Sequence, residues 1–570
     1  MTAHKSTADD SRTRQSLKHL TGSNLALVIL LIVTITSFYG TAVTTAWARI
    51  AALETIEAYG FAVHEQLMYN FSSTGGFFQT IHLGYDDSWA WSGHRSITFP
   101  INSIIYGTRP SPFWLSQIQA FWMTLGAIPA AWFGYSFIRS KYAAVFGALV
   151  YLTSPALMAL TLQDYQDLVY ATPALMFTIA AMRSGRLTLV VLGVAIGAMP
   201  REETLIISLA VSAFIWPGTW RQLRRNVVTS AVTLLAIYLT LQFTSPIQNT
   251  SHDMPLVNAV SGFLSWPPNI FTPGFPYLGS FYSLLWAPLG IFAIFAPRTA
   301  LLGVALVFMH TTVPWGHGVD RSWGGHVHHM APALPFFMAA TIQGFLLVFS
   351  KIRSENWIMD RIKLERSNGF NYLRFGSLTV LCITSTLWTG NWYKNWSNEY
   401  NLIPSLTIQN PTYVHPVWSL TGQLEDSDVP IIDSRLSLSV SARRASYTWD
   451  DSLFEKAPGL GLGAGTHLIA DRREEQLIEW GMAMAGAEVL GESGPYLLIG
   501  WDEEAVDRAI PISPPSQTHG LRAWPGMPNG REAIAGVAPR EEAPAPPVAP
   551  FETTEHSGPG YAPEQGARRD

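Results

Sequence analysis

Three adjacent charged residues, Arg201, Glu202 and Glu203, interrupt a long apolar stretch in the sequence "GAMPREETLIIS". The apolar runs on either side, 187–200 and 204–218, would form helices only about 21–23 Å long. Because the hydrocarbon core of a bilayer is about 30 Å thick, two such runs would draw the charges below the membrane surface. Charges at that depth must face a cavity or a partner, and carboxylates there are candidates for proton transfer. The alternative is a solvated hairpin turn in a locally thinned bilayer.

A second acidic pair, Asp164 and Asp167, lies in the sequence "TLQDYQDLVYATP". The two aspartates are three residues apart, so they would share one face if this segment is helical. We expect these aspartates and Glu65 to converge with the 201–203 tripeptide on one cavity. There Arg201 should pair with a carboxylate of its own turn or with Asp164, Asp167 or Glu65. The alternative is two loop aspartates, with Asp167 capping the helix that follows.

Two further candidates, Glu65 and His94, lie among aromatic and apolar residues, in "FAVHEQLMYNF" and "WAWSGHRSITFP". Several other acidic residues in this region, among them Glu54 and Asp86, must simply be solvated. Glu65 and His94 stand out because aromatic and apolar residues flank them, which makes both candidates for a functional role.

A histidine-rich segment, "WGHGVDRSWGGHVHHM" (315–330), contains Arg321 and His329. Zinc sites normally hold their ligands at close, paired spacing on one element, such as i, i+4 on a helix, and this segment lacks that spacing. It therefore favours a polar cavity rim with Arg321 and His329 as substrate-binding residues. We expect no metal ligands and no cofactor, although the sequence leaves a divalent metal open.

The composition indicates which elements must position these residues. Hydrophobic residues make up 48% of the 570 residues and charged residues only 14%, against about 25% charged in a typical soluble protein. The deficit falls between Asn24 and Gly390, where apolar runs recur. The single cysteine, Cys382, excludes an intrachain disulfide. The chain contains no phosphate-binding loop and no nucleotide fingerprint, so we do not expect ATP to drive its function directly. We also expect no nucleic-acid partner.

These runs predict an all-α polytopic membrane bundle of about 11 transmembrane helices. The predicted spans are 24–47, 112–138, 142–162, 168–182, 187–200, 204–218, 227–245, 280–297, 299–314, 331–350 and 375–389. Lysine and arginine then concentrate in alternate loops, which predicts that these loops and the N-terminal tail 1–23 are cytoplasmic. The loops of the other side, before residue 391, contain only Arg49, Arg95, Arg109, Arg201 and Arg321.

The transmembrane domain, 24–390, is therefore expected to carry a large outer loop, 49–111. Short β-like runs after Gly390 at 429–433, 466–471 and 496–501, with a helical pattern at 474–485, predict a small extracytoplasmic α/β domain over 391–510. The region 511–570 is rich in Pro, Gly, Ala and Glu, which predicts a disordered C-terminal tail.

The order of motifs along the chain resembles a known family. One span and an acidic loop are followed by "GHRSITFPINSIIY", "PSPFWLSQIQAFWMTLGAIPAAW", "DYQDLVYATP", "MPREETLI" and "HHMAPALPFF". This order is similar to that of a family of prokaryotic predicted membrane proteins called domain of unknown function 2079. That family resembles the GT-C type of polytopic glycosyltransferases, which use lipid-phosphate sugars. The resemblance covers roughly 59–500 and implies a GT-C-like bundle in a bacterial cytoplasmic (inner) membrane.

The resemblance also implies roles for individual residues. Glu65 and Gln66 stand where the family often has an Asp-Gln pair, and His94 matches a loop histidine. Asp164 heads a motif that usually continues Phe-His-Pro, and Glu202 with Glu203 matches a recurrent acidic pair. This chain has Tyr-Gln-Asp after Asp164, so a chemistry that needs the motif histidine would be altered or lost here.

Three functions fit these residues. The first is a glycosyltransferase that takes a sugar from a polyprenyl-phosphate donor at the outer face of the membrane. Glu65, Glu202, Glu203 and Asp164 are its candidate catalytic carboxylates, whereas His94, Asp167, Arg201, Arg321 and His329 are its candidate substrate-binding residues. The second is a transporter or flippase of a lipid or lipid-linked saccharide, and the third is a non-catalytic envelope protein. Charges gathered towards one side of the membrane favour the enzyme over alternating access. Apart from the bilayer, the sequence indicates no protein partner.

Overall fold

The computed structural model describes residues 6–53, 58–75, 96–162, 164–215, 219–244, 289–312, 331–354, 413–425, 428–443, 446–449, 466–483 and 486–501. The predicted span 375–389 and the predicted disordered tail 511–570 lie outside these residues. So do His94, Arg321 and His329 among the predicted site residues.

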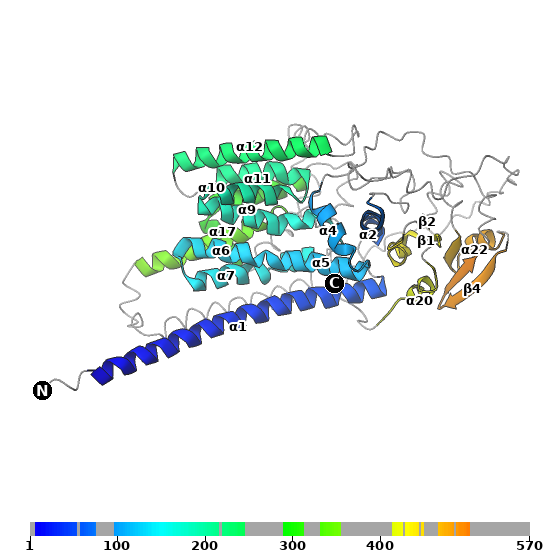
Figure 1. Cartoon of the computed structure of the whole chain (residues 1–570), viewed down its shortest axis with the longest axis horizontal. Coiled ribbons are helices and arrows are strands. Elements are labelled where there is room, and N and C mark those ends of the chain that lie inside the picture. Colours follow the sequence, from blue (N-terminus) through cyan, green and yellow to red (C-terminus); the bar gives the residue numbers. More distant parts are fainter. Residues whose placement is uncertain are drawn as a thin grey trace, which may run out of the picture.

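The described part of the chain is mostly helical, and its long helices form one bundle (Figure 1). The bundle contains α1 (Ser6–Ala52), α5 (Pro112–Leu125), α6 (Ala127–Ile138), α7 (Lys141–Leu152), α8 (Pro155–Leu162), α9 (Ala171–Ser184), α10 (Leu187–Ala198), α11 (Glu202–Phe214), α12 (Trp220–Thr244), the 3-10 helix η3 (Leu289–Phe295), α15 (Pro297–Thr312) and α17 (Leu334–Ser354). These helices coincide with apolar runs that the sequence marks as spans.

Only some of these helices are long enough to span a bilayer on their own. Among the described residues, Leu25–Ala52 within α1 is long and apolar enough, and α7 with α8 passes the same test as one pair bent by 53°. α10 and α11, with 12 and 13 residues, are short, about 18 Å and 20 Å at 1.5 Å per residue. The short pair around Arg201 is thus present, and the total of about 11 spans stays a prediction.

Local sequence explains where several helices begin and end. The Ser111 hydroxyl accepts a hydrogen bond from the Trp114 backbone N–H, 3.1 Å away, and Pro112 occupies the first turn of α5. Both features favour a helix start. At the other end of the bundle, α9 ends at Gly185, which has a left-handed φ of 67° that favours glycine.

Two helices outside the bundle lie at one of its ends. They are α2 (Ala58–Thr74) and α4 (Thr98–Tyr106), and both lie between the bundle and the C-terminal strands (Figure 1). A buried apolar cluster joins them to the bundle and to the C-terminal part, with Leu67 from α2, Tyr106 from α4, Leu115 from α5 and Leu438. We call this end of the bundle the α/β end.

The C-terminal part is a small α/β unit. Its strands β1 (Pro430–Asp433), β2 (Tyr447–Trp449), β3 (His467–Asp471), β4 (Glu488–Ser493) and β5 (Tyr496–Gly500) form one sheet in the order β2-β1-β3-β5-β4. β1 pairs in parallel with β2 and β3, whereas β5 pairs antiparallel with β3 and β4. The helices are α20 (Val417–Thr421), the 3-10 helix η6 (Ser434–Ser439) and α22 (Glu475–Met482).

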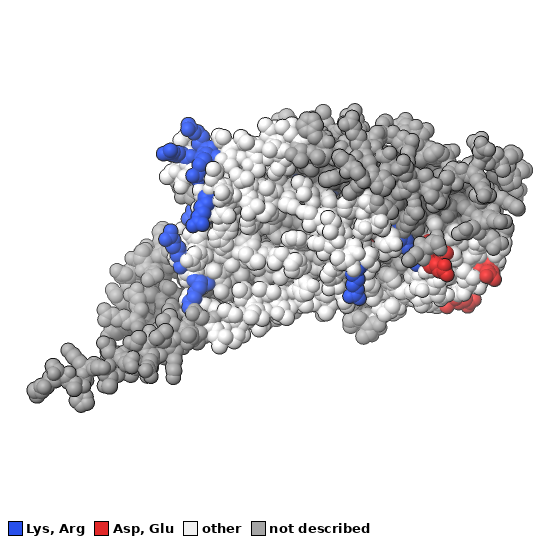
Figure 2. Space-filling model, viewed as in Figure 1, with Lys and Arg blue, Asp and Glu red and all other residues white. Residues whose placement is uncertain are grey.

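Basic side chains gather at the bundle end opposite the α/β unit, whereas acidic side chains lie on that unit (Figure 2). Two contacts show that basic residues from different helices lie together at this end. The Arg183 guanidinium lies over the Phe137 ring, 4.4 Å from its centroid, and Arg225 donates a hydrogen bond to the Gly185 carbonyl. We call this end the basic end. Its charge is the asymmetry expected of a cytoplasmic face.

This polarity predicts the result of reporter fusions. Alkaline phosphatase fused after Ile510 should be active, because the α/β unit would lie outside the cytoplasm. The same reporter inserted at Gly185, in a connection at the basic end, should be inactive. Activity at Gly185 together with inactivity after Ile510 would reverse the orientation proposed for the chain.

Candidate functional site

The carboxyl group of Glu65 is fully buried on α2, with none of its residue surface exposed. Its Oε1 accepts a hydrogen bond of 2.8 Å from the Tyr106 phenol, and its Oε2 makes a hydrogen bond with the Ser441 hydroxyl. Burial raises the pKa of Glu65 to about 8, although these two hydrogen bonds pull in the opposite direction. A carboxyl group with this pKa can both release and accept a proton near neutrality.

Tyr106 is suited to keep its role as a donor to Glu65. Burial, and then the negative charge of Glu65, raise the pKa of Tyr106 well above its usual value. The phenol therefore stays protonated at any pH at which Glu65 titrates.

A buried ion pair joins the end of α1 to the segment after α8. Arg49 Nη2 lies 3.6 Å from Asp164 Oδ1, and both side chains are almost fully buried. Arg49 Nη1 also donates a hydrogen bond to the Leu162 carbonyl. A small cavity adjoins this pair. Its lining includes Arg49 and Asp164 themselves, together with Gln119 and Tyr165.

A second buried ion pair lies at the turn between α10 and α11. Arg201 Nε lies 3.7 Å from Asp167 Oδ1, and only 7% of either side chain is exposed. The turn is fixed by the Thr204 hydroxyl, which donates to the Arg201 carbonyl over 2.6 Å. Among the described residues, Arg201 Nε and Nη1 and Glu203 Oε2 are buried without a hydrogen-bond partner. Arg201 thus keeps donor capacity for a further anion.

Backbone and side-chain contacts connect the two ion pairs to α2 and α4. The Ile97 N–H donates to the Met199 carbonyl over 2.8 Å, which ties the start of α4 to the α10–α11 turn. The Tyr165 hydroxyl accepts from Asn102 Nδ2 over 3.1 Å, and the Tyr165 ring lies 5.7 Å from the ring of His64. Tyr165, which lies between the two aspartates in the sequence, therefore connects their segment to α4 and to the helix of Glu65.

The structure thus brings several predicted site residues to the α/β end, namely Glu65, Asp164, Asp167, Arg201 and Glu203. Glu202 begins α11, but its side chain lies outside the described part of the structure. Within the described residues, no group of three or more His, Cys, Asp or Glu side chains could hold a metal ion. The histidine-rich segment 315–330 is not covered by that statement.

The structure agrees with the alternative of two aspartates outside an α-helix, but not with the capping role expected of Asp167. Asp164 lies in a non-helical stretch, and only the 3-10 helix η1 (Asp167–Tyr170) begins at Asp167. The two side chains therefore bind different arginines instead of sharing one helix face. Asp167 does not cap this helix either, because Gln166 occupies the cap position and makes no side-chain cap hydrogen bond.

Sequence reasoning missed three residues that shape the site: Arg49, Tyr106 and Ser441. Arg49 looked like a loop cation because the apolar run ends at Trp47, whereas α1 continues to Ala52. Tyr106 lies in the predicted outer loop 49–111, and nothing in the sequence singled it out there. No signal in the sequence marks Ser441 as a partner of Glu65, which lies 376 residues away.

The burial of the Arg201–Asp167 pair predicts a large cost for breaking it. Asp167→Asn should destabilise the protein by about 3–5 kcal/mol, because it leaves a buried guanidinium without its counter-charge. Denaturant unfolding of the full chain in detergent would measure this cost. The matched control is Glu492→Gln in the exposed Arg472–Glu492 pair, whose side chains are 50% and 59% exposed. That change should cost less than about 1 kcal/mol, and equal costs for both variants would contradict the burial of Arg201.

Solved structures of two proteins are among those to which the chain is similar. The chain is similar to the structure of ArnT from Cupriavidus metallidurans bound to undecaprenyl phosphate, at 12% identity and a TM-score of 0.44, over 84% of this chain and 98% of that chain. It is also similar to the same protein in the apo state, at 10% identity and a TM-score of 0.46, over 85% of this chain and 99% of that chain. A further similar structure is the oligosaccharyltransferase of Archaeoglobus fulgidus in the apo form, at 11% identity and a TM-score of 0.36, over 81% of this chain and 74% of that chain.

No curated protein matches the chain. The family described as predicted membrane protein (DUF2079) matches residues 51–359, which is more than half of the 570 residues. The chain therefore belongs to the DUF2079 family of predicted membrane proteins.

Proposed function

We propose that this membrane protein is a glycosyltransferase that uses a polyprenyl-phosphate sugar at the outer face of a bacterial cytoplasmic membrane. In this proposal the basic end and the N-terminus face the cytoplasm, and the α/β unit lies outside. The observation that carries the proposal is the fully buried Glu65, which lies at the same end of the bundle as two buried Arg–Asp pairs. A carboxylate base and cationic groups for a leaving phosphate are the groups that inverting sugar transfer needs.

Glu65 is the base in this proposal. The acceptor hydroxyl oxygen bonds to the anomeric carbon of the sugar while the bond from that carbon to the phosphate oxygen breaks. The polyprenyl phosphate leaves with that electron pair, and the hydroxyl proton passes to Glu65. A carboxylate has about four acceptor positions, and Tyr106 and Ser441 use two of those of Glu65.

Arg201 and Arg49 are the groups that meet the phosphate. Guanidinium groups bind phosphate oxygens through charge-assisted hydrogen bonds, and these gain strength where water is excluded. Arg201 Nε and Nη1 have no hydrogen-bond partner among the described residues and are therefore the first candidates. Asp164 and Asp167 are each bound to an arginine, so we assign them to holding these cations in place rather than to proton transfer. Glu202, Glu203, His94, Arg321 and His329 would complete the cavity.

Sugar transfer can be measured with the full chain in lipid nanodiscs, as release of polyprenyl phosphate from a panel of synthetic polyprenyl-phosphate sugars. Glu65→Gln should lower the rate by about 10²–10⁴-fold, because it removes the base. For the natural chain, kcat/KM should rise with pH and level off above about 8, the pKa to which burial raises Glu65.

The matched control is Glu479→Gln on α22, where the side chain is exposed, and this variant should transfer at the natural rate. A Glu65→Gln variant that is as active as the natural chain would contradict the proposal, and so would a rate that does not change between pH 5 and 8. Movement of the lipid across the bilayer without release of polyprenyl phosphate would instead indicate a flippase.

A further inference from the structure

The α/β unit contacts the candidate base directly. Glu65 and its neighbour Gln66 are both fully buried at the contact between α2 and the segment that follows η6. Glu65 makes a hydrogen bond with Ser441, and Gln66 Nε2 donates to the Ser446 hydroxyl over 3.3 Å. Two adjacent residues of the membrane part are therefore bound to serines of the α/β unit.

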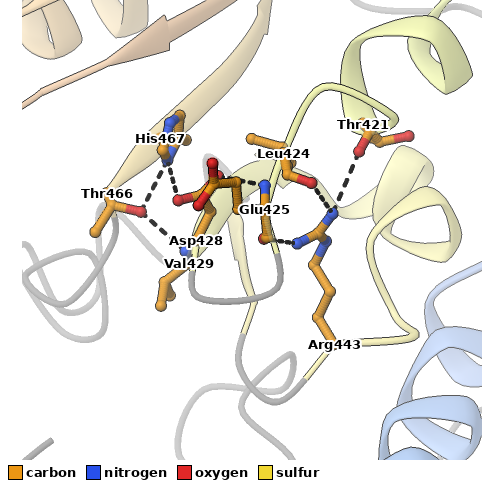
Figure 3. Close-up of polar contacts among 8 residues, drawn as sticks. All are labelled: Thr421, Leu424, Glu425, Asp428, Val429, Arg443, Thr466 and His467. Carbon is orange, nitrogen blue, oxygen red and sulfur yellow. Dashed lines mark hydrogen bonds and ion pairs between the residues drawn. The ribbon is translucent and has the colours of Figure 1, made fainter.

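The Ser441 segment is held firmly within its own unit. Arg443, two residues later, donates hydrogen bonds of 3.3 Å and 3.1 Å to the carbonyls of Thr421 and Leu424, at and beyond the end of α20 (Figure 3). A cation at the C-terminal end of a helix is favourable because the free carbonyls there carry partial negative charge. The position of the Ser441 hydroxyl is thus set by α20 as well as by η6.

The two contacts of the Ser441 hydroxyl indicate the charge state of Glu65. A serine hydroxyl has one hydrogen, but Ser441 Oγ contacts two acceptors, Glu65 Oε2 and, at 2.9 Å, the Leu438 carbonyl. Both contacts are satisfied together when Glu65 is protonated. The carboxyl proton on Oε2 is then donated to Ser441 Oγ, and the Ser441 hydrogen is donated to the Leu438 carbonyl. When Glu65 is ionised, the Ser441 hydrogen must serve one acceptor and leave the other.

We propose that Ser441 of the α/β unit is a positioning residue that governs the proton on Glu65, so that the α/β unit forms part of the active site. This inference deepens the proposed function and rests on Glu65 as its base. With Glu65 protonated, the Ser441 hydroxyl points to Leu438. When Glu65 loses its proton, the hydroxyl turns to the carboxylate and stabilises the form that accepts the acceptor's proton.

The other described groups around Glu65 do not change hydrogen-bond partners when it ionises. The hydrogen bond from Tyr106 on α4 also lowers the pKa of Glu65, but the phenol donates to Oε1 in both charge states and stays protonated. On α2 itself, Tyr69 contributes to raising the pKa of Tyr106, and His64 contacts the rings of Phe99 and Tyr165. The guanidinium of Arg443, beyond η6, is bound to carbonyls of the α20 end. Ser441 is thus the group whose hydrogen can turn when Glu65 ionises.

The proposal can be tested without substrate by infrared spectroscopy of the full chain in nanodiscs. The C=O stretching band of protonated Glu65 is identified as the band that Glu65→Gln removes, and it is then followed as a function of pH. In the natural chain the band should disappear with a midpoint near pH 8. In Ser441→Ala the midpoint should rise by about one pH unit or more, because the ionised form loses a hydrogen-bond donor. The pH profile of kcat/KM should move by the same amount.

Two variants separate this role from a purely structural one. Ser439→Ala removes a hydroxyl with the same local contact, a 2.8 Å hydrogen bond to the carbonyl three residues earlier, and it should leave the midpoint unchanged. Ser441→Thr keeps the hydroxyl and should restore the natural midpoint. An unchanged midpoint in Ser441→Ala would overturn the proposal, and so would an equal rise in Ser439→Ala. A midpoint that moves as expected while Glu65→Gln transfers sugar at the natural rate would support the Ser441–Glu65 contact and refute the catalytic role of Glu65.

Discussion

Removing an ionisable group from water costs several kcal/mol unless a counter-charge or hydrogen bonds replace the lost hydration. The α/β end of the bundle buries Glu65, Asp164, Asp167, Arg49 and Arg201. Their burial is compensated in two ways. The two aspartates bind arginines, whereas Glu65 lies between two hydroxyl groups and has its pKa raised by burial. Because each compensating group comes from a distant segment, the site exists only when α1, α2, α4, α11 and the α/β unit are assembled together.

The attachment of the α/β unit to α1 shows how this assembly is secured. The carbonyl of Ala51, in the last turn of α1, has no partner within the helix itself. It accepts hydrogen bonds from the His415 N–H over 2.8 Å and from the Trp418 indole over 3.1 Å. α20 and the residues just before it therefore supply hydrogen-bond donors to the end of α1, two residues after Arg49. The same end of α1 thus holds the α/β unit through its backbone and Asp164 through a side chain.

The sequence predicted much of the fold because apolar periodicity and charge are local signals. Runs of apolar residues located α10, α11, β1, β3 and β5. β4 was not predicted because most of its residues are exposed, and β2 was not predicted because it has only three residues. Charges within apolar surroundings marked Glu65, Asp164 and Arg201 as candidates. A carboxylate partner was expected for Arg201, and Asp167 is that partner. The partners of Asp164 and Glu65 could not be predicted, because Arg49 looked like a loop residue and Ser441 is a small neutral residue whose importance comes only from tertiary contact.

In the proposed function, the buried charges at the α/β end form one site for a lipid-linked phosphate. The most direct test is an experimental structure of the full chain in nanodiscs with added polyprenyl phosphate. We predict phosphate density within about 3 Å of Arg201 Nε or Nη1, or of the Arg49 guanidinium, which is hydrogen-bonding distance. Phosphate bound instead among Arg221, Arg224 and Arg225 at the basic end, with the Arg201–Asp167 pair unchanged, would contradict it.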